Sequence, residues 1–422
     1  MQEHAPDINA LIAVKNLDSF NPDQALNFLG ELTDLSLDME RMDGLRRAVA
    51  LGEELLEREL EQDQRSLLHY FLSNAWSNQR ALKEGGEMPD FGWQQEEIVQ
   101  ELRHLRESLA SDDGLLPDDR VCQILTNLGN SMSHVGRFSE AIAYWDASLA
   151  RIPASHLARG NRALGFVWYA QTLYNGEHWE IFLRQAHTEL KTALLLPIHD
   201  DAKAFFDIQR RSVEEALGPE ALARRSDLSA YPSPPGEADV PYLQWCLGHR
   251  LFLNPLNELG LNPIAAQDVL VMPTNAGDAA TAYDTLKQAY AAARVAAYEA
   301  LEGSTTEDTE SLSDSLSGLF NAAAHVLATY LDLGIPDGKA SLSTLWYQDQ
   351  GPNAGLLPPF TNSLNWSLRG LYAMGKDLAN ESPSPTSTPN ERLLWLLKRA
   401  RETLLSLALA IYTEERQQRY AK

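Results

Sequence analysis

The chain has 422 residues, of which 44% are hydrophobic and 22% are charged, a composition typical of globular proteins with ample material for a core. Asp and Glu number 59 against 35 Lys and Arg, and this formal net charge of -24 excludes a general coat of nucleic acid or anionic lipid. Two cysteines, Cys122 and Cys246, exclude a disulfide framework and indicate a reducing compartment.

The chain shows neither a targeting signal nor a membrane-spanning segment. Residues 1–7 are polar and acidic, unlike the start of a signal peptide. A membrane helix needs about 18 or more apolar residues without charges. The segment 393–412 comes closest, but Lys398, Arg399 and Glu402 interrupt it. We therefore expect a soluble protein located in the cytoplasm.

The first part of the chain has the pattern of consecutive helices. Apolar residues recur at three-and-four spacing over 45–60, 66–82 and 94–109, and no long stretch alternates as a strand does. The turn-forming groups Gly85-Gly86 and Asp112-Asp113-Gly114 separate these segments. This pattern predicts an all-α region.

The next segment, 125–153, follows the 34-residue tetratricopeptide (TPR) pattern of paired helices. Gly129 lies on the first helix, Gly136 in the turn, and Trp145 and Ser148 on the second helix. Small residues let two antiparallel helices approach closely, and the tryptophan fills the remaining space. The spacing therefore predicts a tightly packed helical hairpin.

A looser copy of the same pattern covers 165–197, with a turn stretched by residues 174–179. Because a single repeat cannot bury its own apolar face, neighbouring repeats must stack. We therefore predict a TPR-like helical superhelix over residues 1–230. Trp179 and His178, in the stretched turn, are candidates for contact with a protein partner, since an exposed indole is a frequent interface anchor.

A turn-rich segment, Tyr231-Pro232-Ser233-Pro234-Pro235-Gly236, predicts a domain boundary. Helical patterns resume after it, over 242–253, 278–301, 312–333, 366–378 and 391–419. They predict an antiparallel helical bundle over 240–422, with a flexible link near 381–390 that is rich in Pro, Ser and Thr. Asn254 and Asn257 are expected to fix a turn through bonds from their side chains to the backbone.

Several strings resemble one bacterial family, the branch of the HEPN superfamily in which a TPR-bearing region precedes the HEPN bundle. The likeness runs from about residue 120 to the C-terminus. It is carried by these strings: 125–130 (LTNLGN), 242–247 (YLQWCL), 251–257 (LFLNPLN), Lys287, Tyr290, Ala293-Arg294, Tyr298, 330–335 (YLDLGI), 368–372 (LRGLY), 376–378 (KDL) and 399–402 (RARE).

The resemblance implies a helical HEPN bundle, and many HEPN proteins are metal-independent ribonucleases of phage-defence and toxin–antitoxin systems. Their chemistry uses an Arg-x4–6-His motif, in which His moves the proton of the RNA 2′-hydroxyl and Arg holds the phosphate. Here the expected interval, 380–390, contains neither residue, and no histidine follows His325. The one Arg-x4-His pair, Arg151 and His156, encloses Pro153, and we interpret it as a coincidence of spacing.

Four polar residues of the bundle, His249, Arg250, Arg294 and Arg369, are candidates for an anion or RNA-phosphate pocket. The alternative is that they form buried ion pairs with Asp268, Glu299 or Asp377. Cys246 and His249 have Cys-x2-His spacing, but a structural zinc needs four ligands and no second pair lies nearby. We expect no metal and no cofactor.

The sequence therefore favours a non-catalytic interaction or sensor protein of a bacterial antiviral or toxin–antitoxin system. Its TPR face would bind a protein or peptide partner, preferably a basic one, and its HEPN-like bundle would mediate association, including a possible homodimer. The alternative is a ribonuclease with an unconventional active site, in which His249 or His325 acts with Arg294 or Arg369. A purely structural subunit is a third possibility.

Overall fold

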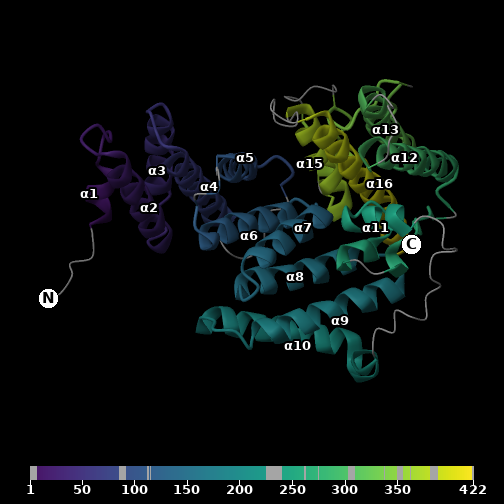
Figure 1. The fold of residues 1–422 in the computed structure, drawn as a ribbon, viewed down its shortest axis with the longest axis horizontal. Helices are drawn as coiled ribbons and strands as arrows, with labels where there is room; N and C mark the ends of the chain where they lie inside the picture. Colours follow the sequence, from purple (N-terminus) through teal and green to yellow (C-terminus); the bar gives the residue numbers. More distant parts are fainter. Residues whose placement is uncertain are drawn as a thin grey trace. The chain divides into compact units, whose positions relative to one another are not determined.

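The protein is all-α. The computed structural model describes residues 7–84, 92–111, 114, 116–224, 240–260, 263–273, 275–302, 309–336, 338–348, 355–361, 363–380 and 388–420. Over these ranges the chain forms sixteen α-helices and no strand, with one isolated bridge between Tyr347 and Leu356 (Figure 1). The predicted fold class is confirmed. None of the helices described combines the length and the apolar character that spanning a bilayer requires.

The chain divides into two compact units. Unit 1 comprises residues 1–131 and 144–161, and unit 2 comprises residues 132–143 and 162–422. The predicted boundary at 231–236 lies outside the described residues, so the division at about residue 230 stays a prediction. Residues 132–143, around the turn of the predicted TPR hairpin, belong to the same compact unit as the bundle.

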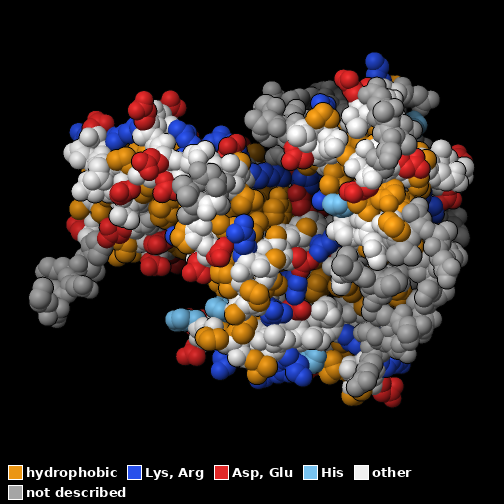
Figure 2. Space-filling view, viewed as in Figure 1, with side chains coloured by type: hydrophobic (Ala, Val, Ile, Leu, Met, Phe, Trp, Pro, Cys, Tyr) orange, Lys and Arg blue, Asp and Glu red, His pale blue; other side chains and the backbone are white. Residues whose placement is uncertain are grey.

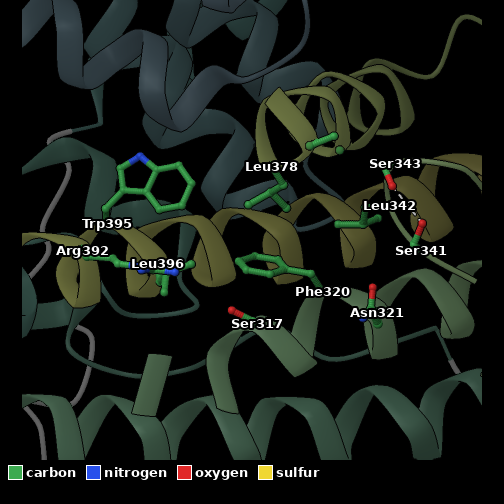
Figure 3. Close-up of a pocket in the computed structure, with 12 residues that line it drawn as sticks. Ser317, Phe320, Asn321, Ser341, Leu342, Ser343, Leu378, Arg392, Trp395 and Leu396 are labelled. Carbon is green, nitrogen blue, oxygen red and sulfur yellow. Dashed lines mark hydrogen bonds between the residues drawn. The ribbon is translucent and has the colours of Figure 1, made fainter. Parts of the chain in front are cut away.

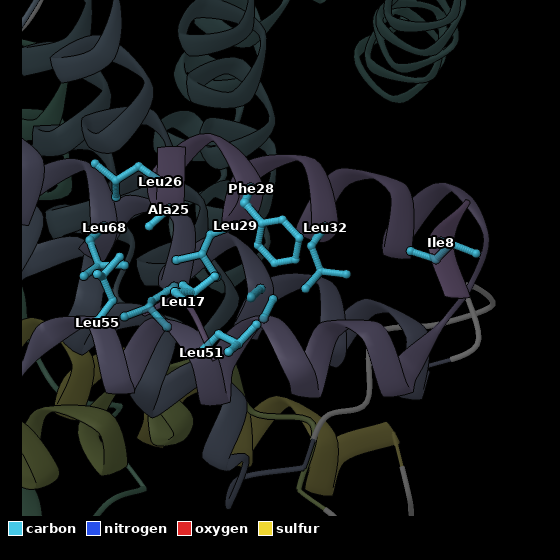
Figure 4. Packing of buried hydrophobic residues seen from close by; sticks show 13 residues of the cluster. Ile8, Leu17, Ala25, Leu26, Phe28, Leu29, Leu32, Leu51, Leu55 and Leu68 are labelled. Atoms are coloured by element: carbon cyan, nitrogen blue, oxygen red, sulfur yellow. The ribbon is translucent and has the colours of Figure 1, made fainter. Parts of the chain in front are cut away.

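Unit 1 begins with five helices: α1 (Ile8–Ile12), α2 (Pro22–Asp38), α3 (Met42–Leu56), α4 (Gln62–Glu84) and α5 (Glu96–Ala110). The three predicted segments correspond to α3, α4 and α5, whereas α1 and α2 are not among the predicted helices. A capping box starts α2, because the Asn21 side chain accepts from the Gln24 amide and the Gln24 side chain accepts from the Asn21 amide. Leucines of α2, α3 and α4 face one another in a continuous apolar cluster (Figure 4).

The predicted hairpin consists of α6 (Asp118–His134) and α7 (Phe138–Arg151). A Cβ atom at Gly129 would lie 2.5 Å from the Trp145 indole nitrogen, so only glycine permits this approach. The indole N–H donates to the Asn130 side chain at 3.1 Å. The Ser148 hydroxyl donates to the Cys122 carbonyl at 3.0 Å. The expected packing role of these small residues is confirmed, while the assignment to the TPR family stays a prediction.

Three more helices follow: α8 (His156–Thr172), α9 (Gly176–Ala193) and α10 (Asp200–Ala223). Helices α8 and α9 pack through Phe166, Tyr169 and Phe182, with ring centroids 5.1 to 5.7 Å apart. The predicted stretched turn is wrong. Helix α9 starts at Gly176, because Asn175 is its N-cap and its side chain accepts from the amides of residues 177 and 178.

The remainder of unit 2 contains α11 (Val240–Gly248), η2 (Pro255–Leu259), η3 (Pro263–Ala265), α12 (Asp278–Glu302), α13 (Thr309–Tyr330), α14 (Pro358–Thr361), α15 (Trp366–Asn380) and α16 (Pro389–Tyr420). Helix α16 packs against α12, α13 and α15, which forms the predicted bundle (Figure 1). The first of these helices ends earlier than predicted, since Arg250 adopts a left-handed backbone with φ of 57°. Most of the predicted flexible link, 381–387, lies outside the described residues.

Candidate functional site

The segment around Asn254 has the predicted turn. The Asn254 side chain accepts from the Leu256 amide at 3.0 Å. The Asn257 side chain accepts from the Phe252 amide and donates to the Leu247 carbonyl, both at 3.2 Å. These bonds satisfy backbone groups that are buried without a regular helix, as buried polar groups require.

Arg294, one of the four candidate pocket residues, forms a buried ion pair. Its guanidinium donates twice to the Asp268 carboxylate, at 2.9 and 2.8 Å, and once to the Leu251 carbonyl at 2.9 Å. The side chain also lies over the Phe252 ring, 4.6 Å from its centroid. Bonds with Asp268 keep the pKa of Arg294 above its ordinary value despite burial. For Arg294, the structure therefore shows the predicted alternative, a buried ion pair with Asp268, and not an open anion pocket.

His249 and Arg250 lie at the end of α11 and are both half-buried. Arg250 approaches Glu258 at 3.6 Å. The His249 ring contacts Trp245 edge to face, with centroids 5.1 Å apart. Burial and the nearby Lys398 charge lower the pKa of His249, so its neutral form is favoured near pH 7.

Arg369, on α15, lies beside a histidine that sequence spacing could not reveal. Its Nη2 donates to Nε2 of His134 at 3.2 Å, and its guanidinium lies 5.6 Å from the Trp366 ring centroid. The bond requires that Nε2 carry no proton. Arg369 is only 3% exposed and His134 is half-buried, so the guanidinium is shielded from bulk solvent. None of the described contacts joins Arg369 to the other three candidates.

Close backbone contact brings residues 132–143 against α15. A Cβ atom at Gly136 would collide with the Trp366 carbonyl, and one at Gly370 would lie 2.7 Å from the Gly136 carbonyl oxygen. Phe138 completes the contact, with its ring 5.8 Å from Trp366. Gly370 belongs to one of the strings that carry the HEPN resemblance, and its packing role explains why a side chain is absent there.

Beside this contact lies a set of buried and half-buried charges that we call the charge network. It has four basic and four acidic members, which are Arg137, Arg250, Arg399 and Arg401, and Glu140, Glu258, Asp377 and Glu402. Equal numbers of each sign allow all eight charges to be compensated internally. This network was missed at the level of sequence, since its members come from four distant segments.

Arg137 is the centre of one half of the network. It is 1% exposed and forms ion pairs with Glu140 and Asp377, with Glu402 at 3.8 Å. Arg399 approaches Glu140 at 2.6 Å and Glu402 at 3.6 Å. Burial, followed by repulsion from Glu140, raises the pKa of Glu402 to about 6 although two arginines lie nearby.

Arg401 is the centre of the other half. It forms an ion pair with Glu258, which is 1% exposed, and donates to the carbonyls of Phe252 and Asn254 at 2.9 and 3.2 Å. The Ser139 hydroxyl donates to Glu258 at 2.7 Å. The network therefore holds residues 137–140, η2, α15 and α16 together, and its strings 376–378 and 399–402 are among those of the HEPN resemblance.

The two candidate partner-binding residues lie in the first turn of α9. His178 is 8% exposed, and burial lowers the pKa of its imidazole. Trp179 is half-buried rather than exposed. The tryptophan with an exposed side chain among the described residues is Trp168, at 41%. The exposure expected of Trp179 is therefore wrong, and its contact with a partner stays a prediction.

A cleft of about 270 Å³ opens between α13, the segment 341–343, α15 and the start of α16 (Figure 3). Its floor is apolar, with Phe320, Leu378 and Leu396, and Arg392 and Trp395 line one end. Within the part of the chain that the structure describes, no group of three or more His, Cys, Asp or Glu residues could hold a metal ion.

Comparison with known proteins gives one family. Residues 314–393 match the model of the LA2681-like HEPN family. No curated protein and no solved structure matches the chain. The matched segment runs from α13 through α15 to the start of α16, and it contains Arg369, Gly370 and Asp377. The segment 314–393 is therefore similar to the LA2681-like HEPN family, and the match is evidence of a HEPN domain in this part of the bundle.

Proposed function

We propose that this chain is a non-catalytic interaction and regulatory protein of a bacterial antiviral-defence or toxin–antitoxin system. In this proposal the helical region before residue 230 binds a protein partner and the HEPN domain mediates association. The presence of a HEPN domain supports the setting, because such domains are frequent in these systems. The cytoplasm is the proposed location.

One observation carries the non-catalytic part of the proposal. Three buried arginines of the bundle that could bind phosphate are engaged in internal bonds: Arg294 with Asp268, Arg401 with Glu258, and Arg369 with His134. Arg294, Arg369 and Arg401 are each at most 5% exposed. A phosphodiester bound by any of these arginines would have to displace a buried partner, which costs several kcal/mol.

The interaction part rests on exposed apolar side chains and on charge. Of the large hydrophobic residues that are exposed, five lie on or next to α8–α10, which are Leu157, Trp168, Leu195, Phe205 and Ile208. Acidic side chains are spread over α1–α4 (Figure 2). The apolar residues on α8–α10 favour a partner segment with hydrophobic side chains, and the net charge of -24 favours one that also carries basic residues.

The test is capture of a partner by the full chain, followed by mass spectrometry of cross-linked peptides. We expect a stoichiometric protein that cross-links to α8–α10 and is lost in the Phe205→Asp/Ile208→Asp double variant. Leu37→Asp, at an exposed residue of α2, is the matched control and should retain the partner. The absence of any stoichiometric partner, or equal retention by all variants, would refute the interaction role.

A second candidate function is an unconventional ribonuclease, and the Arg369–His134 contact favours it. A histidine and an arginine 3.2 Å apart are the pair that HEPN chemistry needs, although here they come from two segments and the arginine is buried. Incubation with tRNA in the presence of EDTA tests this candidate. Cleavage that disappears in His134→Ala but persists in His199→Ala, an exposed histidine before α10, would establish it over the first proposal.

A further inference from the structure

The cleft of about 270 Å³ in the HEPN domain has walls that are fixed without a ligand. Gly375 lets the segment 341–343 contact α15, because a Cβ atom there would collide with the Leu342 carbonyl. The Trp346 indole donates to that same carbonyl at 2.5 Å. The Ser341 hydroxyl forms hydrogen bonds with the hydroxyls of Ser343 and Thr344, at 2.9 and 2.8 Å. Such a wall does not need to reorganise when a ligand binds.

The opposite end of the cleft offers an aromatic face and a positive charge. The Arg399 guanidinium lies over the Trp395 ring, 5.3 Å from its centroid, and Arg399 is itself held by Glu140 and Glu402. This contact restrains the indole. Figure 3 shows Trp395 and Arg392 at one end, Ser341 and Ser343 at the other, and Phe320 and Leu378 between them.

Arg392 differs from the arginines of the charge network. Its side chain is exposed at the edge of the cleft, and among the described residues no carboxylate lies within ion-pair distance of it. Among the described residues that line the cleft, it is also the one cation. Although Glu391 precedes it in the chain, Arg392 forms no ion pair within the described residues, so its guanidinium is available to an anion from solution.

We propose that this cleft binds a small monocarboxylate with a flat apolar body. The carboxylate would bind Arg392 through two parallel N–H···O bonds. The apolar body would lie on Phe320 and Leu378 beside Trp395, and a polar group at its far end would reach Ser341 or Ser343. This inference goes beyond the proposed protein-binding role and does not depend on it.

The charge and the volume of the cleft favour a small monocarboxylate over a polyanion. A single arginine compensates one negative charge, and the acidic chain repels any further charge on the ligand. A volume of about 270 Å³ is at the lower limit of small-molecule sites, so a bicyclic acid fits better than a larger ligand.

The experiment measures binding to the full chain by calorimetric titration. Three compounds are compared: 1-naphthoate, its neutral analogue 1-naphthalenemethanol, and adenosine 5′-monophosphate. We expect naphthoate to bind at least about tenfold more tightly than the alcohol, and Arg392→Gln to remove this preference. Arg211→Gln, on the exposed face of α10, is the matched control and should leave it unchanged. Leu378→Trp, which fills the floor, should weaken both compounds.

Naphthoate binding that is absent at millimolar concentration, or unaffected by both Arg392→Gln and Leu378→Trp, would overturn the proposal. Binding of adenosine monophosphate that is tighter than that of naphthoate would overturn the assigned ligand class. A thermal melt of each variant that matches the original chain ensures that the loss reports the site and not the fold.

Discussion

The apolar cluster of α1–α4 and the charge network of the bundle show two different ways to build an interior. In the first, side chains such as Leu29, Leu32 and Leu51 are at most 2% exposed and belong to one cluster of buried apolar residues. In the second, Arg137 and Glu258 are each 1% exposed, and every charge has a partner of opposite sign. An apolar cluster is stabilised by burial, at roughly 1.5–3 kcal/mol for each large side chain.

The charge network gains little net free energy from its ion pairs, because desolvation offsets most of the attraction. What it specifies is geometry, since residues 137–140, η2, α15 and α16 are fixed by directional bonds. The difference implies that the two regions respond in opposite ways to conservative substitutions. Hydrogen exchange measured separately in α2–α4 and in α16 tests this contrast without treating the whole chain as one unfolding unit.

The largest effect is expected from Arg401→Met. The substitution leaves the buried Glu258 carboxylate with the Ser139 hydroxyl at 2.7 Å and Arg250 only at 3.6 Å. Removal of one partner of a buried ion pair costs about 3–5 kcal/mol. We expect that loss in the free energy of unfolding of α16, measured by hydrogen exchange. Arg211→Met is the control, since that arginine is 67% exposed and its pair is worth about 0–1 kcal/mol. Equal losses in the two variants would contradict this prediction.

Leu32→Ala is expected to destabilise α2–α4 by about 3 kcal/mol, from lost burial and the cavity it leaves. Leu32→Met keeps the volume and should cost under about 1.5 kcal/mol. Arg401→Lys, by contrast, should lower the free energy of unfolding of α16 nearly as much as Arg401→Met does, because an ammonium cannot replace the guanidinium fork. Hydrogen exchange of all three variants decides the point. If Arg401→Lys lowered the free energy of unfolding as little as Leu32→Met does, the two regions would not differ in their response to conservative substitutions.

Unit 1 also contains a pair of buried histidines, His69 and His104, whose effect on stability depends on pH. The Nδ1 atoms of His69 and His104 lie 2.9 Å apart, and the Glu53 carboxylate lies 3.2 Å from Nε2 of His104. Burial, with the charges of Arg65 and Arg103, lowers the pKa of His69 to about 4. Burial and Arg103 lower that of His104 to about 3.

Both histidines are therefore neutral in the folded state and bind protons more readily when unfolded, where their pKa is about 6.5. Stability is fully present above pH 6.5 and falls as the pH decreases toward 4, by about 1.4 kcal/mol for each proton and pH unit. For each histidine, the free energy of unfolding measured in α4 and α5 should fall by up to about 2 kcal/mol between pH 6.5 and 5. Hydrogen exchange at the two pH values measures the loss, and a His69→Asn/His104→Asn variant should flatten it. An unchanged slope in that variant would contradict the role of this pair.

The sequence could predict the helices, the close approach at Gly129 and the alternative pairing of Arg294 with Asp268, because these features follow from periodicity or from few candidates. It could not predict the charge network or the Arg369–His134 contact. Asp377 lies 240 positions from Arg137, and charge alone does not say which of 59 acidic residues pairs with which arginine. The cleft was also out of reach, since Phe320, Ser341 and Arg392 become neighbours only when α13 and α16 pack.

The smallest expected effect, from Glu402→Gln, asks whether every member of the charge network is needed. The pKa of Glu402 is raised to about 6 by burial and by Glu140, against about 4.3 when unfolded. The folded state thus favours the protonated carboxyl, and its stability falls as the pH rises from about 4.3 through 6. Glutamine mimics the protonated form. At pH 7 we expect Glu402→Gln to raise the free energy of unfolding of α16, measured by hydrogen exchange, by about 1 kcal/mol, and at pH 4 we expect no gain.

Asp377→Asn is the matched control within the same half of the network. The Asp377 carboxylate accepts directly from Arg137, so the amide should cost about 1–3 kcal/mol at pH 7. Opposite signs for two acid-to-amide changes around one arginine would show that the network is fixed by hydrogen-bond geometry rather than by the count of charges. A loss at Glu402→Gln as large as that at Asp377→Asn would instead mean that all four carboxylates contribute through their charge.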